Sequence, residues 1–127
     1  MTETTSGEAI HVDLPALLQG RNGPGAVWSA ASEDLNVNLV VFGEGAGVQA
    51  HVNSEVDVLL VGIEGQGRVL VDDVVHVLKV GQAVLVPKGT RRQIEAVGER
   101  FAYLTCHRRR PHLWPLNAPR PRREKAG

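Results

Sequence analysis

The sequence contains a single cysteine, Cys106, among its 127 residues. One thiol cannot form a disulfide within the chain, and it excludes the zinc modules that are built from several cysteines. Aromatic residues make up only 4% of the chain, so a stacking platform for single-stranded nucleic acid has little to be built from. No apolar run approaches the roughly 18 residues of a membrane-spanning helix, and residues 1–7 form no apolar signal peptide. These absences predict a cytoplasmic protein without a membrane partner.

The formal net charge of the chain is zero, because 14 Lys and Arg balance 14 Asp and Glu. The balance hides an asymmetry. Residues 1–107 contain 7 Lys and Arg against 13 Asp and Glu, whereas residues 108–127 contain 7 Lys and Arg and one Glu. Prolines at positions 111, 115, 119 and 121 exclude a helix or a central strand from this last segment. We therefore predict an acidic body and, over residues 108–127, a basic, proline-rich tail without regular structure.

The basic tail has two interpretations. Clustered arginines are attracted to phosphate groups, which would make the tail an interaction arm. Alternatively, it is a solvated tail that packs in part through Leu113 and Trp114 on the body or on a partner subunit. Twenty residues with one tryptophan offer no element that could enter a nucleic-acid groove. We expect the second interpretation to hold, and no nucleic-acid partner.

Valine is the most frequent residue in the chain. The chain has 19 Val, 13 Leu and 3 Ile, and β-branched residues favour strands. Short apolar runs alternate with Gly, Asp and Asn, and they predict strands near residues 26–31, 35–42, 46–52, 57–64, 67–72, 74–79, 83–87, 91–97 and 100–107. Asp72-Asp73, between two Val-rich runs, is predicted to form a tight hairpin turn. Short strands at this spacing are typical of an all-β sandwich or barrel.

The chain is long enough for one domain with one core, since a chain of this size buries roughly two-thirds of its unfolded surface. Residues 1–9 show no apolar periodicity and are predicted to be disordered. Residues 10–107 are predicted to form the β-barrel. Within them, Ile10 to Leu18 is an apolar patch interrupted by Pro15, which we interpret as a strand end followed by a turn.

Two stretches resemble the paired motifs of the cupin superfamily. The first is Gly45-x5-His51-x-Asn53 with Gly65 further on, and the second is Gly81-x5-Pro87-x-Gly89-x2-Arg92, with Gln66 to Val80 as a 15-residue gap between them. The resemblance implies a jelly-roll β-barrel of two antiparallel sheets. It also implies a homodimer, and the valine-rich strand at 56–63, apolar on both of its faces, suits a sheet face that a partner covers.

The metal positions of the two motifs are not kept. In the cupin superfamily, two His and one Glu of the first motif and one His of the second converge on a divalent metal. This sequence has His51 at the first position, but Asn53 and Arg92 replace the other histidines. The carboxylate position falls on Asp57 or on Val58, depending on which end of the motif is counted from, and a shift of one residue reverses the face of a strand.

These residues predict a site without a metal or any other cofactor. A first-row metal usually requires about three imidazole or carboxylate ligands, and a permanently protonated guanidinium would stand where the cation should lie. We expect Arg92 to pair with Asp57, Glu55 or an anionic ligand, and Asn53 to orient that ligand. His107 shares strand parity with Phe101 and Tyr103 and is a further candidate ligand-binding residue.

The sequence is compatible with three functions. The first is a small cupin that binds a small, anionic molecule through His51, Asn53, Asp57, Arg92 and His107. The second is an enzyme, either a metal-dependent oxygenase or isomerase with atypical ligands or a metal-independent enzyme with His51 as general base. The third is an interaction or regulatory module that uses its basic tail. The sequence designates no catalytic residue, and Cys106 has the character of a small buried hydrophobe rather than a nucleophile.

Overall fold

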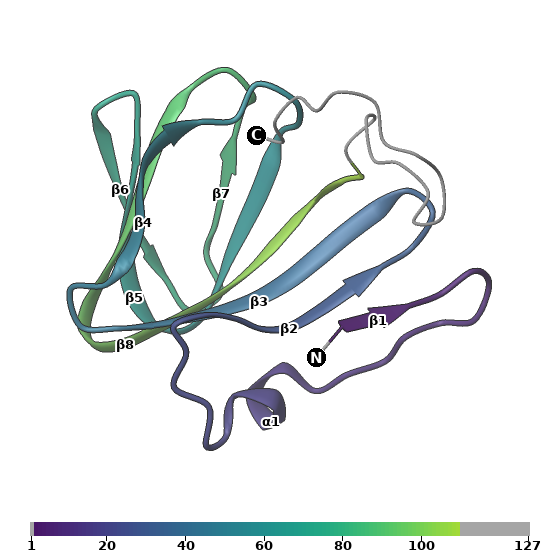
Figure 1. Ribbon diagram of the computed structural model, residues 1–127. Coiled ribbons are helices and arrows are strands. Elements are labelled where there is room, and N and C mark those ends of the chain that lie inside the picture. The colour runs from purple at the N-terminus through teal and green to yellow at the C-terminus, as the bar shows by residue number, and fades with distance from the viewer. Residues whose placement is uncertain (1, 110–127) are drawn as a thin grey trace.

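The computed structural model describes residues 2–109. It contains eight strands and one short helix (Figure 1). Their bounds are β1 Thr2–Thr4, α1 Leu14–Leu18, β2 Gly25–Ala31, β3 Leu35–Gly43, β4 Gly47–Val52, β5 Val58–Val71, β6 Val74–Lys79, β7 Ala83–Val86 and β8 Arg91–Arg108. The predicted all-β jelly-roll class is confirmed. Residues 110–127 of the predicted tail lie outside the described residues, and Arg108, its first residue, is the last residue of β8.

Two long, bent strands connect the two halves of the barrel. β8 pairs with β3 through its second half, with β4 through its first half and with β5 along most of its length. β5 also pairs with β6 at one end and β7 at the other. The barrel therefore has two halves that share β5 and β8 and are joined by hydrogen bonds into one curved sheet. The strand order is β1-β2-β3-β8-β5-β7 in one half and β4-β8-β5-β6 in the other. All pairings between named strands are antiparallel except that of β1 with β2.

The sequence predicts two separate strands in each of β5 and β8, and the structure differs. It joins 57–64 with 67–72, and 91–97 with 100–107. Gly65 and Gly98 lie at the two junctions with φ of +68° and +80°, and the β5–β8 register shifts beside Gly65. Glycine adopts such dihedrals without a steric penalty, so the chain bends there while pairing resumes on the other side.

The predicted hairpin turn is present, since Asp72 and Asp73 both have positive φ, as a two-residue turn of the I′ type requires.

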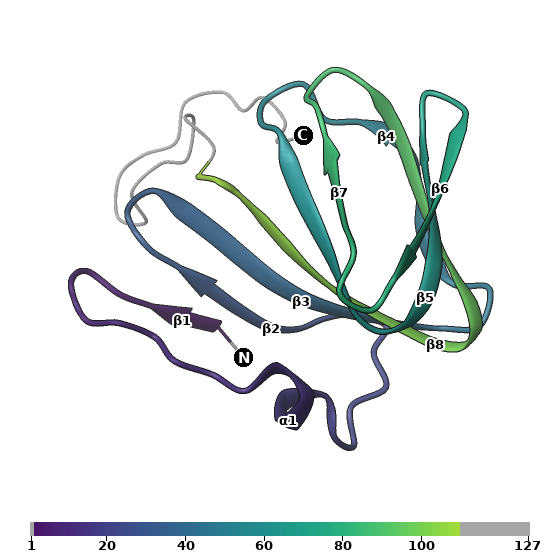
Figure 2. The same cartoon turned by 180° about the vertical axis from the view of Figure 1, so that it is seen from behind.

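The alternation of side chains divides the core into two clusters. The inner cluster fills the barrel and contains Phe42, Val56, Val58, Leu60, Val69, Leu78, Val86, Ile94, Ala96, Phe101 and Tyr103. The outer cluster lies on the opposite face of β2, β3 and β8 and contains Leu18, Trp28, Ala30, Leu39, Val41 and Ala102. Leu18 belongs to α1, which lies beneath the sheet formed by β2 and β3 (Figures 1 and 2). The N-terminal segment thus covers much of the outer face.

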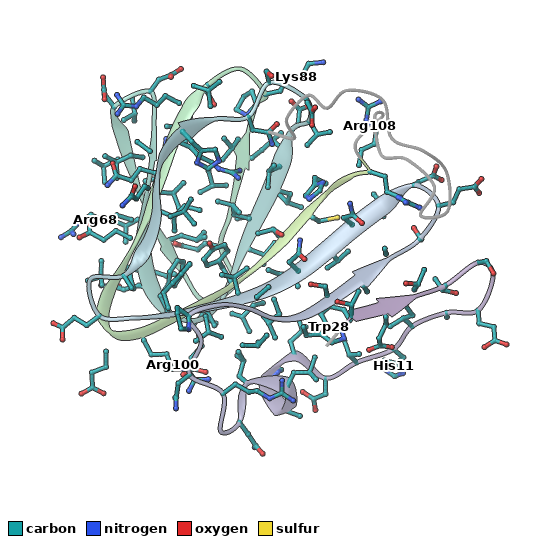
Figure 3. All side chains as sticks on the ribbon, in the orientation of Figure 1. His11, Trp28, Arg68, Lys88, Arg100 and Arg108 are labelled. Atoms are coloured by element: carbon teal, nitrogen blue, oxygen red, sulfur yellow. The ribbon has the colours of Figure 1, made fainter. Side chains whose placement is uncertain are left out.

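The N-terminal segment is more regular than the sequence indicates. Residues 2–4 pair with β2, and the indole N–H of Trp28 donates to a carboxylate oxygen of Glu3 at 2.6 Å, on the side of the sheet that faces α1 (Figure 3). Where we expected a turn, α1 begins: Oδ1 of Asp13 accepts from the N–H of Ala16 at 3.2 Å, and Pro15 lies in the first turn, where its missing N–H is not needed. No helix within residues 2–109 is long and apolar enough to cross a membrane.

Candidate functional site

Arg92 enters the barrel from the first half of β8. Ile94 and Ala96, which share its strand parity, are buried in the inner cluster, so the alternation directs Arg92 to the same face. Its partners across the sheet are His51 on β4 and Val71 on β5. Nε and Nη1 of its guanidinium are buried. A positive charge is therefore held within the wall of the barrel, next to the imidazole of the first motif.

Tyr103, on the second half of β8, faces the same interior. It is 2% exposed, and its ring stacks on Phe101 with centroids 5.0 Å apart and lies 6.3 Å from Phe42. Burial raises the pKa of the Tyr103 hydroxyl far above its ordinary value, and the charge of Arg92 offsets part of that rise. The phenol is therefore neutral at any physiological pH. Arg92 and Tyr103, which are 11 positions apart along β8, both face the barrel interior, and the charge of Arg92 acts on the Tyr103 hydroxyl.

Asn53 shapes the loop that follows β4. It is 5% exposed, and its Oδ1 accepts from the backbone N–H of Glu55 at 2.9 Å and of Val56 at 3.4 Å. Its Nδ2 is buried without a hydrogen-bond partner in the described part of the chain. A buried donor without a partner costs about 1–3 kcal/mol. Asn53 is thus both a structural residue, through its oxygen, and an available donor, through its nitrogen.

Of the remaining candidates, Asp57 lies outside the barrel, whereas His107 lies at the far end of β8 on the face that Tyr103 and Thr105 share. Asp57 is exposed, and its Oδ1 accepts from the N–H of Lys88 at 2.8 Å, whereas Val58 faces the inner cluster. Of the two alternatives for the carboxylate position, the interior one is therefore occupied by valine. His107 is half-buried near the end of β8, where its Nδ1 lies 2.9 Å from the backbone oxygen of Arg108.

Asp57 and His107 both line a surface pocket of about 530 Å³, together with Leu59, Leu85 and Lys88. Lys88 and Arg108, which are labelled in the upper part of Figure 3, also line this pocket. The structure thus places His51 opposite Arg92 and Asn53 directly after the strand of His51. It does not bring Asp57 into the barrel with them.

We expect Asp57 to contribute to stability rather than to ligand binding. Replacing Asp57 with alanine removes the acceptor for the Lys88 N–H, and we expect the free energy of unfolding to fall by about 1 kcal/mol. Asp57→Asn keeps an oxygen at that position and should lose less. Urea denaturation measures both changes. Equal stability of the alanine variant and the unchanged protein would show that this hydrogen bond contributes nothing.

Tyr103 is the site residue that the sequence analysis missed. The sequence did place Tyr103 on the same face of its strand as Phe101 and His107. An aromatic residue in an apolar strand is ordinarily a core residue, so this pattern did not mark Tyr103 as part of a site.

The sequence analysis also missed a polar row across β2, β3 and β8. In this row Asn38 Nδ2 donates to Thr105 Oγ1 at 3.1 Å, and Ser29 Oγ donates to Asn38 Oδ1 at 2.7 Å. The parity of Thr105 with Tyr103 places this row on the face of the sheet that lines the barrel.

Residues 38–107 match the model of the cupin domain. The chain belongs to the cupin family. The matched segment begins within β3 and ends within β8, so it includes both motifs and the gap between them. No curated protein matches the sequence significantly.

Solved structures share the cupin fold of this chain. A protein from Bacillus halodurans has a TM-score of 0.69 at 18% identity, over 89% of this chain and 86% of that one. A protein from Thermus thermophilus has a TM-score of 0.68 at 23% identity, over 80% of this chain and 98% of that one. KdgF from Halomonas sp. has a TM-score of 0.61 at 22% identity, over 65% of this chain and 76% of that one. Identities this low show a common fold and no more.

The side chains at the metal positions of this cupin do not fit a divalent metal. Arg92 directs a permanent positive charge into the interior. Of Asp57 and Val58, the two alternatives for the carboxylate ligand, the one that faces inward is Val58. Oδ1 of Asn53 is already used by two backbone N–H groups. Within residues 2–109, no three His, Cys, Asp or Glu side chains converge in a way that could hold an ion. His51 alone among the four positions retains metal-binding chemistry.

Proposed function

We propose that this cupin binds a small anionic molecule at the barrel interior, with Arg92 as its principal contact and no metal. The observation that supports this most directly is the position of the Arg92 guanidinium, which has buried nitrogens on the inward face of β8. A guanidinium binds carboxylates and phosphates through paired, charge-assisted hydrogen bonds. In a partly buried position such a contact is weakly screened, which favours an anion over a neutral ligand.

The groups around Arg92 favour the same class of ligand. Asn53 has a buried amide nitrogen to donate, and Tyr103 has a hydroxyl proton to donate, which burial makes still harder to lose by raising its pKa. His51 lies opposite Arg92, and its imidazole adds a further polar group to the site. The cluster is therefore rich in hydrogen-bond donors, which suits a ligand with several acceptor oxygens. Among residues 2–109, an enzymatic role has no comparable support in the geometry of the site.

Arg92→Gln is expected to weaken anion binding about 10- to 100-fold, which corresponds to losing hydrogen bonds to a charged group. The measurement is the rise in melting temperature, followed by calorimetric titration, with acetate, succinate, citrate and inorganic phosphate. Succinamide, which has the skeleton of succinate but no charge, should not stabilise the protein.

The matched control is Arg91→Gln. Arg91 is the neighbour of Arg92 on β8 and is exposed on the opposite face, so its replacement should leave binding unchanged beyond a small loss of long-range attraction. Two results would contradict the proposal: the absence of binding by all four anions, or an equal loss of affinity in the two variants.

A homodimer and a cytoplasmic location are part of the proposal. The single free thiol of Cys106 is compatible with a reducing compartment. For the dimer, the sequence points to the strand at 56–63. In the structure Val58 and Leu60 face the core, and on the opposite face Leu59 is 38% exposed beside Leu85 at 63%. Much of the outer face of the sheet is already covered by the N-terminal segment of the same chain, so a partner subunit would contact another surface.

A further inference from the structure

Four of the described strands lie at edges of the sheet, because each pairs with only one neighbour: β1, β4, β6 and β7. An open edge can pair with another chain, and most proteins protect their edges. Three of these edges are protected. β1 has three polar residues, β4 is interrupted by an irregularity between Val48 and His51, and β7 has four residues and is followed directly by Pro87.

The edge of β6 has no such protection. Its pairing with β5 is regular from Val74 to Lys79, and it contains neither proline nor any charge before Lys79. Val74, Val75 and Val77 are 57%, 52% and 49% exposed, so apolar side chains are exposed on both faces of the strand. β6 forms the outer margin of the molecule in both views of the ribbon (Figures 1 and 2).

The backbone groups that β6 directs outward can be assigned from the hairpin. In a two-residue hairpin the residues that flank the turn, here Val71 and Val74, exchange hydrogen bonds with each other. Alternation then directs the backbone groups of Val75, Val77 and Lys79 away from β5. Lys79 confirms this, because its N–H donates to Oε1 of Gln82 at 3.0 Å and its C=O accepts from the N–H of Gln82 at 3.0 Å.

We propose that β6 is the dimer interface, in which it pairs antiparallel with β6 of a second copy. This inference rests on the proposed homodimer and names its contact surface. A two-fold axis at His76 sets Val75 opposite Val77 of the second copy, and the reverse, so that their outward N–H and C=O groups form four hydrogen bonds. The sheet β4-β8-β5-β6 would then continue through its symmetry mate as eight strands.

Charge selects this register among those that the backbone allows. With the axis at His76, Asp73 of each copy lies opposite Lys79 of the other, and both side chains are exposed in the isolated chain. A register centred on Val75 or on Val77 would lose both of these ion pairs. On one face of the sheet the register also joins Val75 and Val77 of both copies into a single apolar patch. Opposite charges and apolar pairs directly across a ladder are both stabilising.

The first test is the oligomeric state by sedimentation equilibrium of the full chain. We expect a dimer, and we expect Val75→Lys to weaken dimerisation at least about tenfold, because the charge enters the apolar patch twice. Val52→Lys is the matched control, since Val52 is also about half exposed, at 51%, but lies on β4. It should dimerise as the unchanged protein does. Circular dichroism verifies that both variants are folded.

The second test is specific for the register. His76 would face its own symmetry mate in a non-hydrogen-bonded pair, where the close approach of the two strands suits a disulfide. In a Cys106→Ala background, His76→Cys should therefore form a covalent dimer under mild oxidation faster than Val75→Cys or Val77→Cys. A monomeric wild-type protein would overturn both the interface and the proposed homodimer. A dimer that resists Val75→Lys and does not cross-link at position 76 would overturn the interface alone and indicate another face.

Discussion

Phe101→Ala is expected to lower the free energy of unfolding by about 3–5 kcal/mol, the usual range for removing a fully buried phenylalanine. Phe101 has no exposed surface. Its ring stacks on Tyr103 and lies so close to Gly67 that a Cβ at position 67 would be 2.3 Å from a ring carbon. The barrel wall is therefore in contact with the ring on two sides and could collapse only partly into the space left behind.

Urea denaturation measures this change, and two variants serve as controls. Phe101→Leu retains much of the apolar volume and should lose clearly less than the alanine variant. Leu85→Ala removes an apolar side chain that is 63% exposed, and it should change stability by no more than about 0.5 kcal/mol. A loss below about 1 kcal/mol for Phe101→Ala would mean that the ring does not fill the core as described.

Gly65→Ala is expected to destabilise the protein by about 2–4 kcal/mol, from two separate causes. Gly65 has a φ of +68°, which is unfavourable for any residue with a Cβ. In addition, a Cβ at this position would lie 2.0 Å from the carbonyl oxygen of Arg100, a backbone atom that cannot turn aside. The substitution therefore strains the chain and pushes β5 away from β8 at the bend.

Gly81→Ala separates the two causes. Gly81 has a φ of +82°, but no atom lies within 4 Å of the position of an added Cβ, so only the dihedral penalty of about 1–2 kcal/mol remains. Comparing the two variants by urea denaturation should show the larger loss for Gly65. An equal loss would show that the close approach to Arg100 does not restrict this position.

Local patterns in the sequence were sufficient for the strands and for the hairpin at Asp72-Asp73, because both depend on neighbouring residues. They were not sufficient for the continuity of β5 and β8. A glycine between two apolar runs is typical of a turn, and whether pairing resumes beyond it depends on the partner strand. The order in residues 2–4 depends on β2 and Trp28, which lie more than 20 positions away.

The candidate site was predictable to a similar extent. His51 and Arg92 lie opposite each other as the two motifs imply, since the motifs fix the spacing within each strand. The carboxylate position was not predictable, because a shift of one residue decides between the buried Val58 and the exposed Asp57. The role of Tyr103 depends on its distance from Arg92 in space, which no local pattern records.

The loop after β4 and the turn before β8 are fastened to each other. The carbonyl of Asn53 accepts from the N–H of Gly89 at 2.8 Å, beside the hydrogen bond between Asp57 and Lys88. These hydrogen bonds hold the two segments in place, so a guest molecule would not need to immobilise them when it arrives. Little conformational entropy is then lost on association, so even a compact guest with few atoms retains most of the free energy of its contacts as affinity.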